Sequence, residues 1–315
     1  LSAPHERKAK VVLDLNGGNV VPQNLDVVVV APHQTPGRKF YREAAVFAKR
    51  TGARLAMINY ESANWFNEIS PFKRPEYKWN HWRELTHHGC LVLSSAAESQ
   101  RYAQQWYDHN PEGTLFDIWQ PAINSPVADA ISNQPREKRI SVLMRFDDKH
   151  KGADSLESLL DERLAGWTLS ILVGKNPNTD ALKKLDSQAH AVGMRIQVHE
   201  RVNDEEKFRL LKSSAVLVHP SYFEGFGYPP AEAIYCETPV VAYDLPVIRE
   251  TCGPAAIYVP PGDHDQLREA VVSTATNPHL DSKSFSHVKE LMSFDARSQH
   301  IEDVLIRYLN GPMPH

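Results

Sequence analysis

The sequence predicts an α/β protein with two domains, each built around a parallel β-sheet. From residue 140 onward, short aliphatic runs alternate with amphipathic helical segments, a pattern typical of parallel sheets covered by helices on both faces. The first part of the chain shows the same alternation less regularly. A length of 315 residues suffices for two domains of medium size. We expect domains at residues 1–137 and 138–295, and a helix in 296–315 that crosses back to the first domain.

The elements of the first domain are expected from short β-branched runs and amphipathic segments. The clearest strand is the valine-rich run 25–32, and the clearest helix is 42–52, where apolar residues recur among charged ones. The expected strands are 9–18, 25–32, 53–60 and 89–95, and the expected helices are 42–52 and 96–109.

The second domain follows a polar segment near residues 131–139, which sits between periodic segments as a linker would. Ligands of parallel α/β sheets bind beyond the carboxyl ends of the strands, so the loops after its first four strands should share one crevice. Those loops begin after Phe146, Gly174, Glu200 and Ser221. The expected strands are 140–146, 168–174, 195–200, 215–221, 239–244 and 256–261, and the expected helices are 154–166, 179–193, 203–214, 229–236 and 296–310.

Composition excludes several classes of protein. No apolar run approaches the roughly 20 residues needed to span a bilayer, and the first ten residues lack the apolar core of a signal peptide. Three cysteines without CxxC spacing suggest neither a zinc site nor a disulfide framework. No RNA- or DNA-reading motif is present, so a nucleic-acid partner is not expected. The expected location is the cytoplasm, with a peripheral position at the inner face of a membrane left open.

Charge is unevenly distributed along the chain. Through Cys90 there are 13 Lys and Arg against 8 Asp and Glu, and after it there are 22 against 31. A basic first part could face an anionic acceptor or a membrane surface, or its cations could simply be solvated.

The stretch from Glu224 to Glu232 carries the strongest functional signal. The turn Gly225-Phe226-Gly227 frees backbone N–H groups before a helix, and Pro229 or Pro230 suits the first helical position. Glu232 then falls in the first helical turn, where the helix dipole stabilises a carboxylate. The two carboxylates could cap an ordinary helix, but two acids at a crevice also accept hydrogen bonds from vicinal hydroxyls. A ligand rich in hydroxyl groups is the sharper hypothesis.

A second signal lies in the loop after the first strand of the same domain. Arg145 ends that strand, and Lys151 follows six residues later, before Gly152. Guanidinium and ammonium groups are the usual partners of phosphate oxygens, although Asp147 and Asp148 could balance them in a solvated loop. Together, the two signals fit a ligand with a diphosphate and hydroxyl-rich rings, which describes a nucleotide sugar.

These segments resemble the retaining glycosyltransferases of family 4, which have the GT-B fold of two Rossmann-like domains facing a central cleft. Residues 220–250 resemble the E-x7-E signature region of that family, and 145–152 its Arg…Lys-Gly diphosphate loop. Residues 171–177 and 255–271 resemble two further family segments, in the same order along the chain. The resemblance covers residues 140–275, about half of the chain.

The resemblance implies a role for each matching residue. Glu224 and the amides of 225–227 would hold the donor sugar, Glu232 would bind the nucleotide ribose, and Arg145 with Lys151 would neutralise the leaving diphosphate. Gly17 and Gly18 resemble a glycine turn near the donor phosphates. The family needs no metal ion or other cofactor, retains the anomeric configuration and transfers to a hydroxyl acceptor. The implied catalytic residues are Glu224, Arg145 and Lys151, and the implied donor-binding residues are Gly17, Gly18, Gly174, Gly225, Phe226, Gly227, Tyr228 and Glu232.

The chain departs from the family pattern at several positions. Met144 and Glu237 stand where the family usually has glycine, which changes how closely the backbone can approach the donor. Tyr60-Glu61 stand where a sugar-contacting histidine is common, so Glu61 is a weaker candidate, as is His33. Only six residues separate Gly18 from the next strand, so the first domain is either reduced or incomplete in this chain.

The aromatic and basic segment 64–89 has two interpretations. Its tryptophans could line an acceptor groove or touch a membrane surface, or they could pack as a lid. Its three histidines, His81, His87 and His88, lack the carboxylate or cysteine support of a metal site.

Two rival functions remain at this level. A sugar-nucleotide epimerase could share the fold, but the order of the segments disfavours it. A phosphorylase could share it too, but it would need a lysine site for pyridoxal phosphate, and no such site is found in the sequence. A nucleotide-sugar-binding subunit without catalysis is the rival of a different class. The donor base, the acceptor and the oligomeric state are left open.

Overall fold

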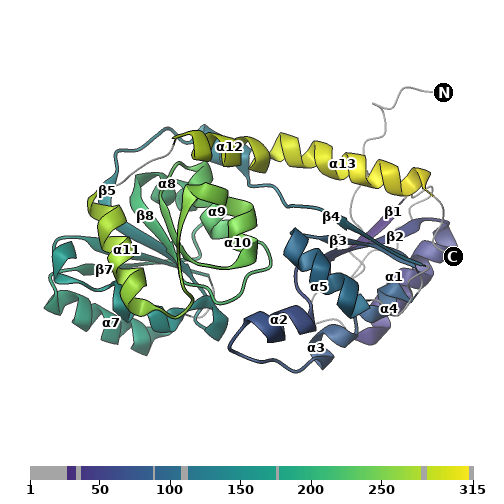
Figure 1. The fold of residues 1–315 in the computed structure, drawn as a ribbon, viewed down its shortest axis with the longest axis horizontal. Coiled ribbons are helices and arrows are strands. Elements are labelled where there is room, and N and C mark those ends of the chain that lie inside the picture. The colour runs from purple at the N-terminus through teal and green to yellow at the C-terminus, as the bar shows by residue number, and fades with distance from the viewer. Residues whose placement is uncertain are drawn as a thin grey trace.

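The structure, a computed structural model, contains two separate parallel β-sheets (Figure 1). It describes residues 27–32, 37–87, 89–107, 113–174, 177–277 and 282–311. Within these ranges, one sheet has four strands in the order β1-β2-β3-β4, and the other has six in the order β10-β9-β8-β5-β6-β7. All neighbouring strands pair in parallel, as the sequence predicts.

The first sheet carries short strands between amphipathic helices. Helix α1 (Arg38–Thr51) buries one alanine-rich face and ends at Gly52, whose φ of 71° closes the helix in the left-handed region. The expected strand 9–18 lies outside the described residues. Strand β4 and helix α6 were not among the predicted elements. The other elements are β1 (Val27–Val30), β2 (Arg54–Asn59), β3 (Cys90–Ser94), β4 (Thr114–Ile118), α2 (Ala63–Ile69), α3 (Tyr77–Asn80), α4 (Arg83–Thr86), α5 (Ala97–Tyr107) and α6 (Ser125–Ala130).

The aromatic segment of the first domain is packed inside it. Trp65, Trp79 and Trp82 are all buried, and Trp65 stacks on Tyr102 at a ring-centroid distance of 6.0 Å. These tryptophans therefore form core rather than an open groove, which supports the packed interpretation of the segment.

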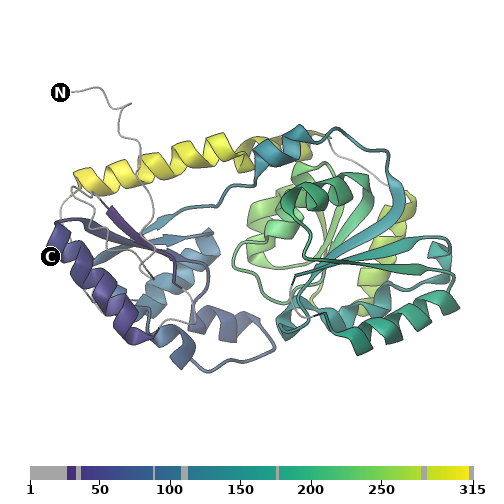
Figure 2. The same cartoon turned by 180° about the vertical axis from the view of Figure 1, so that it is seen from behind.

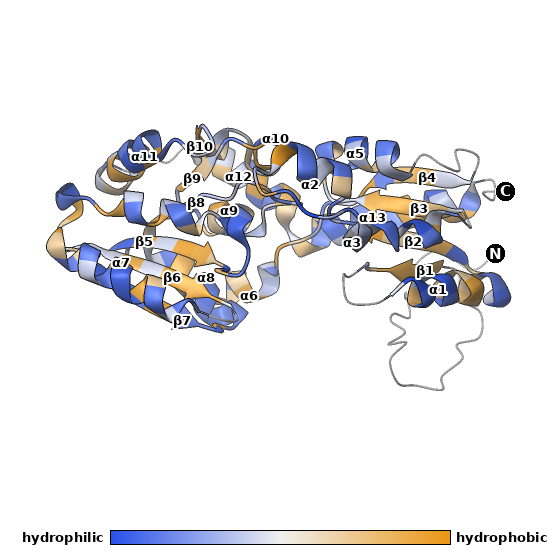
Figure 3. Cartoon of the chain, turned by 90° about the horizontal axis from the view of Figure 1, so that it is seen from below, coloured by the Kyte–Doolittle hydropathy of each residue, from blue (hydrophilic) through white to orange (hydrophobic). Residues whose placement is uncertain are grey.

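The second sheet places its most apolar strands at the centre. All six residues of β8 are buried, because β5 and β9 pair with its two edges and helices cover both faces. Figure 3 shows apolar residues concentrated in the strands, with polar residues on outer helices such as α7. The elements are β5 (Glu137–Met144), β6 (Thr168–Val173), β7 (Arg195–Glu200), β8 (Ser214–His219), β9 (Val240–Tyr243), β10 (Ala256–Val259), α7 (Thr179–Ala191), α8 (Asp204–Ser213), α9 (Tyr228–Tyr235), α10 (Pro246–Cys252), α11 (His264–Thr276) and α12 (Ser282–Met292).

The prediction of an α-helix at 154–166 is wrong. The segment forms short 3₁₀ turns at Ala153–Ser155, Glu157–Leu159 and Glu162–Leu164. Leu160 and Asp161 are extended, and the Asp161 carboxylate accepts a hydrogen bond from the Arg163 N–H. This local cap begins a new turn at the point where an α-helix would have to continue.

Helix α13 (Phe294–Asn310) links the end of the chain to the first sheet. Figures 1 and 2 show it running from the second domain across to the first. Val304 and Tyr308 pack with residues of β2 and β3. The Tyr308 hydroxyl donates to the Leu55 carbonyl at 2.9 Å. Within the described ranges, no helix combines the length and apolar composition needed to cross a bilayer.

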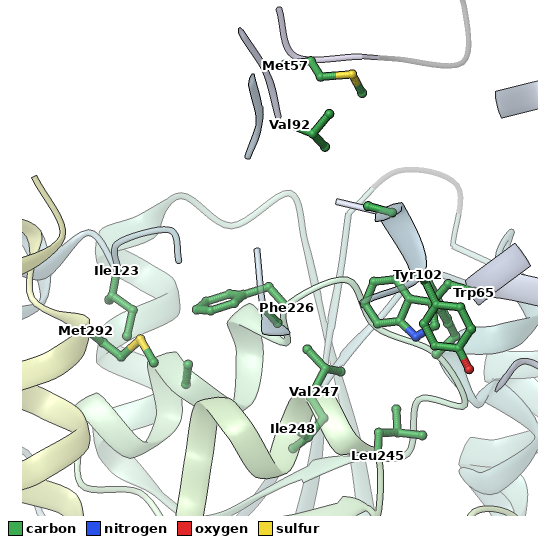
Figure 4. Close-up of a cluster of buried hydrophobic side chains, with 14 of the residues drawn as sticks. Met57, Trp65, Val92, Tyr102, Ile123, Phe226, Leu245, Val247, Ile248 and Met292 are labelled. Atoms are coloured by element: carbon green, nitrogen blue, oxygen red, sulfur yellow. The ribbon is translucent and has the colours of Figure 1, made fainter. Parts of the chain in front are cut away.

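The two domains share one apolar cluster. Phe223 of the second domain lies 4.9 Å from the Trp65 ring and 4.8 Å from the Phe66 ring of the first. Figure 4 draws part of this cluster, including Trp65 and Val247, one from each domain. At the surface, the Glu250 carboxylate accepts the Ala97 N–H at 2.9 Å, which caps α5 from the opposite domain. The domains are therefore packed against each other beside the strand ends.

Candidate active site

A cavity of about 520 Å³ lies at the carboxyl ends of the second sheet, where the first domain closes over it. Its wall includes residues that directly follow β5, β6 and β7, together with the loop after β8. The prediction that these four loops share one crevice is confirmed. From the first domain, the two residues after β2 complete the described part of the wall.

Most of the predicted site residues meet in this cavity. Glu232 lies behind the wall, bound to a side chain that lines it. Gly17, Gly18 and His33 lie outside the described residues. Those that line the cavity are Glu61, Arg145, Lys151, Gly174, Glu224, Gly225, Phe226, Gly227 and Tyr228.

Lys151 and Glu224 form a buried ion pair in the wall. The Lys151 ammonium donates to Glu224 Oε1 at 2.7 Å, and the two side chains keep only 15% and 9% of their surface exposed. Burial raises the pKa of the Glu224 carboxyl, but Lys151 and His219 outweigh burial and hold that pKa well below its usual range. Glu224 is therefore ionised at neutral pH and acts as a hydrogen-bond acceptor.

Glycine brings the Lys151 loop onto the end of β8. Gly152 has a φ of 75°, and a Cβ added to it would lie 1.9 Å from the Pro220 carbonyl oxygen. The Tyr222 N–H donates to the His150 carbonyl at 2.8 Å and joins the two loops again. This contact between backbones explains why glycine follows Lys151, since any side chain there would push Lys151 away from Glu224.

The glycine turn after Glu224 is fixed from both sides. A Cβ at Gly225 would lie 2.3 Å from the Tyr60 carbonyl oxygen, and Ser95 Oγ donates to the Gly225 carbonyl at 2.5 Å. Gly227 has a φ of 90° and directly precedes α9 as its N-cap residue. Among the described residues, the amides of Gly225, Phe226 and Gly227 bind no acceptor. Their N–H groups are thus held rigidly at the cavity and are available to a ligand.

Glu232 is held by a cation rather than by a helix terminus. Helix α9 begins at Tyr228, so the expectation that Glu232 lies in the first helical turn is wrong. Its carboxylate accepts a hydrogen bond from the Lys207 ammonium at 2.7 Å, and Lys207 also binds Asp204 at 2.9 Å. Burial raises the pKa of Glu232, and Lys207 offsets only part of that rise. Lys207 itself lines the cavity beside Glu232.

Arg145 is an exposed cation of the wall. Its side chain keeps 61% of its surface exposed and lies 3.4 Å from one Asp148 oxygen. Arg74 of the first domain binds the other Asp148 oxygen at 2.8 Å and contacts His150 Nδ1 at 3.2 Å. Asp148 is therefore mainly engaged in an interdomain contact, which leaves the Arg145 guanidinium able to reach a ligand.

Sequence reasoning missed His219, which ends β8 and lines the cavity. Its Nε2 lies 3.0 Å from Glu224 Oε1 but makes no hydrogen bond. Its position at a strand end was the available signal, because strand ends in this sheet line the crevice. Lys207 gave no such signal, since it sits in a helix far from Glu232 in sequence.

The described residues contain no cluster of three or more metal-binding side chains. The cations of the wall are four lysine and arginine side chains: Arg145, Lys151, Arg201 and Lys207.

Known proteins share both the sequence pattern and the fold. The family Glycosyl transferases group 1 matches residues 126–286, about half of the chain. The O-antigen chain mannosyltransferase RfbU of Salmonella typhimurium is 30% identical over 135 residues, which cover 43% of this chain but only 38% of that protein. The lipopolysaccharide glucosyltransferase WaaG of Escherichia coli is 27% identical over 299 residues, 87% of this chain and 76% of that protein.

Solved structures show the fold at lower identity. Sucrose-phosphate synthase from Thermosynechococcus elongatus superposes with a TM-score of 0.69 at 17% identity, over 90% of this chain and 73% of that one. Anabaena HepE, solved with UDP and glucose, superposes with a TM-score of 0.65 at 16% identity. The match covers 89% of this chain and 77% of HepE. The two parallel-sheet domains are thus the GT-B arrangement expected from the sequence. The chain belongs to the group 1 glycosyltransferase family.

Proposed function

We propose that the chain is a retaining glycosyltransferase that moves a sugar from a nucleotide-diphosphate-sugar donor to a hydroxyl acceptor, without a metal ion or other cofactor. The observation that carries this proposal is the convergence of Arg145, Lys151 and the Glu224 turn in one cavity. Two cations suit a diphosphate, and a rigid carboxylate followed by unbound amides suits the hydroxyls of a sugar. The E-x7-E spacing of Glu224 and Glu232 supports an enzyme of the family 4 type.

The transfer reaction requires stabilisation of the negative charge that develops on the diphosphate as its bond to the sugar breaks. The bond from the anomeric carbon to the diphosphate oxygen breaks, and a bond from the same carbon to the acceptor oxygen forms. Negative charge grows on the departing diphosphate, where Arg145 and Lys151 stabilise it. The acceptor attacks on the face from which the diphosphate leaves, and a phosphate oxygen takes the acceptor proton. The configuration at the anomeric carbon is therefore retained.

The ribose end of the donor lies toward Lys207 and Glu232. The Lys207 ammonium already donates a hydrogen bond to Glu232 Oε1. A ribose hydroxyl would therefore donate to the second carboxylate oxygen of Glu232, or accept a hydrogen bond from Lys207. The neighbouring backbone after β6 and β7, at Gly174 and Arg201, lines the same side of the cavity. This arrangement supports a binding mode in which the nucleoside, the diphosphate and the sugar follow one another along one wall.

The relatives and neighbours support a nucleotide-sugar donor. RfbU is a mannosyltransferase and WaaG a glucosyltransferase by name. HepE was solved with UDP and glucose, and the pneumococcal transferase GtfA with UDP and GlcNAc. We further propose a cytoplasmic enzyme, with peripheral contact at the inner face of a membrane where the acceptor is lipid-linked.

A thermal-shift panel of UDP-, GDP-, ADP- and dTDP-sugars, followed by assays of nucleotide release, tests the proposal. A bound donor raises the melting temperature of a protein that binds it only when folded. We expect one base class to shift the melting temperature and to release nucleoside diphosphate only with an acceptor, with EDTA causing no loss. Binding without release under any acceptor would favour a binding subunit, and an altered sugar nucleotide without transfer would favour an epimerase.

A further inference from the structure

Arg74 of the first domain reaches into the loop of the second domain that carries Arg145 and Lys151. Its guanidinium Nη2 donates to Asp148 Oδ1 at 2.8 Å and lies 3.2 Å from His150 Nδ1. Arg74 is not part of the described wall of the cavity. Any effect of Arg74 on a donor must therefore pass through the loop that it holds.

The position of Arg74 is fixed within its own domain. The Asn67 side chain accepts a hydrogen bond from the Arg74 backbone N–H at 2.8 Å and donates one to the Arg74 carbonyl at 2.9 Å. The guanidinium carbon lies 4.3 Å from the centre of the Phe66 ring, which is a cation–π contact. With its backbone and its guanidinium face both held, Arg74 presents its N–H groups to Asp148 in one direction.

Asp148 stands between two guanidinium groups that come from different domains. Its Oδ1 accepts the hydrogen bond from Arg74, whereas its Oδ2 lies 3.4 Å from Arg145 Nη1. Arg145 is only three residues away along the chain, and its side chain keeps 61% of its surface exposed, so it has room to turn onto Asp148. Without Arg74, Arg145 would be the remaining ion-pair partner of Asp148 among the described side chains. The carboxylate would then draw Arg145 into a hydrogen-bonded pair and away from a ligand.

We propose that Arg74 is a positioning residue of the donor site, which occupies Asp148 from the first domain and thereby keeps the Arg145 guanidinium available to the donor diphosphate. This inference rests on the proposed transferase function and extends it to a residue outside the described wall of the cavity. All lysine and arginine side chains of that wall belong to the second domain. Through Asp148, the first domain controls one of these cations without touching the diphosphate.

Calorimetric titration with UDP, GDP, ADP and dTDP tests the proposal, because each nucleotide carries the diphosphate without the sugar. For the nucleotide that the wild type binds, Arg74→Met should raise the Kd on the order of tenfold, the usual effect of losing one charge-assisted contact. Arg74→Lys keeps a cation for Asp148 and should raise the Kd less. Asp148→Asn should bind at least as tightly as the wild type, because an amide does not attract Arg145 as a carboxylate does. Arg74→Met combined with Asp148→Asn should return the Kd to within about threefold of the wild type.

The double variant separates this role from a purely structural one. If the ion pair only held the domains together, both single variants would bind more weakly, and the double variant would bind no better than Arg74→Met. That result would overturn the proposal, as would a wild-type Kd in Arg74→Met. Lys39→Met, which alters an exposed lysine of α1 in the same domain, is the control and should keep the wild-type Kd. The binding stoichiometry of each titration reports the folded fraction of that variant. Failure of the wild type to bind any of the four nucleotides would instead overturn the transferase function on which the proposal rests.

Discussion

Lys151 and Glu224 are 73 positions apart in the chain, yet their side chains meet at 2.7 Å in the wall of the cavity. The resemblance to known transferases implies separate roles for them, one toward the diphosphate and one toward the sugar. In the structure the two roles are coupled, because Lys151 holds Glu224 in its charged form and the two side chains hold each other in position. Loss of either should therefore affect both halves of the donor.

Lys151→Met tests this coupling. It removes the cation that stabilises the leaving diphosphate and leaves Glu224 buried beside His219 alone. We expect kcat to fall on the order of 10² to 10³-fold, as for the loss of one transition-state donor. Steady-state kinetics check this, with circular dichroism to confirm the fold. Lys149→Met, an exposed lysine of the same turn, is the control and should retain wild-type kcat. Equal activity in the two variants would remove Lys151 from the mechanism.

Gly225→Ala should uncouple the domains at the cavity. The added Cβ would lie 2.3 Å from the Tyr60 carbonyl oxygen, a backbone atom that cannot rotate away. A displacement of about 1 Å at a reacting centre can cost on the order of 10²-fold in rate, and we expect a loss of that size in kcat/KM. Gly37→Ala is the control, since its Cβ meets no atom within 4 Å. A Gly225→Ala enzyme as active as this control would mean that the turn needs no close approach of the domains.

His150 should make the stability of the protein sensitive to mild acid. Burial, then the nearby Lys151, lower the pKa of His150 from 6.5 to about 4. Between these pH values the unfolded chain binds a proton that the folded protein does not, so the free energy of unfolding falls as the pH falls. The contribution of His150 to the free energy of unfolding is complete above pH 6.5. It decreases by up to about 3 kcal/mol as the pH falls toward 4.

Urea unfolding of the wild type and His150→Gln at pH 7, 5.5 and 4.5 measures this contribution. The wild type should lose more stability on acidification than His150→Gln, whereas His190→Gln, which alters an exposed histidine of α7, should follow the wild type. Parallel pH profiles for the wild type and His150→Gln would show that His150 titrates normally in the fold.

Glu237 occupies a backbone conformation suited to glycine. It follows α9 with a φ of 59°, in the left-handed region that favours glycine. A side chain there costs about 1 kcal/mol, so Glu237→Gly should exceed Glu237→Ala by that amount in free energy of unfolding. Both variants lose the same exposed contact to Lys289, so their difference isolates the backbone. Equal midpoints in chemical denaturation would contradict this account.

The strand-end rule accounts for the part of the site that the sequence predicts well. Arg145 and Gly174 each follow a strand of one parallel sheet, and periodicity alone places them at the same edge. Glycine turns also mark the loops of Lys151 and Glu224 in the sequence. They are needed there because another backbone approaches too closely for a side chain. Local patterns therefore suffice where the geometry is dictated by the sheet.

Pairs that depend on tertiary packing could not be predicted. Lys207 reaches Glu232 from a neighbouring helix, and Arg74 reaches Asp148 from the other domain. No spacing in the sequence relates these residues. The helix expected at 154–166 failed because the Asp161 carboxylate caps a new turn, a competition that amphipathic periodicity does not register.

The most direct test of the proposed function measures nucleoside diphosphate and glycosylated product together, with the donor selected by thermal shift and the hydroxyl acceptor selected by nucleotide release. The wild type should form both in equal amounts, and proton NMR should show the first-formed product with the anomeric configuration of the donor. Lys151→Met should form neither at a comparable rate. Donor binding without product, an inverted product, or undiminished transfer by Lys151→Met would contradict the proposed mechanism.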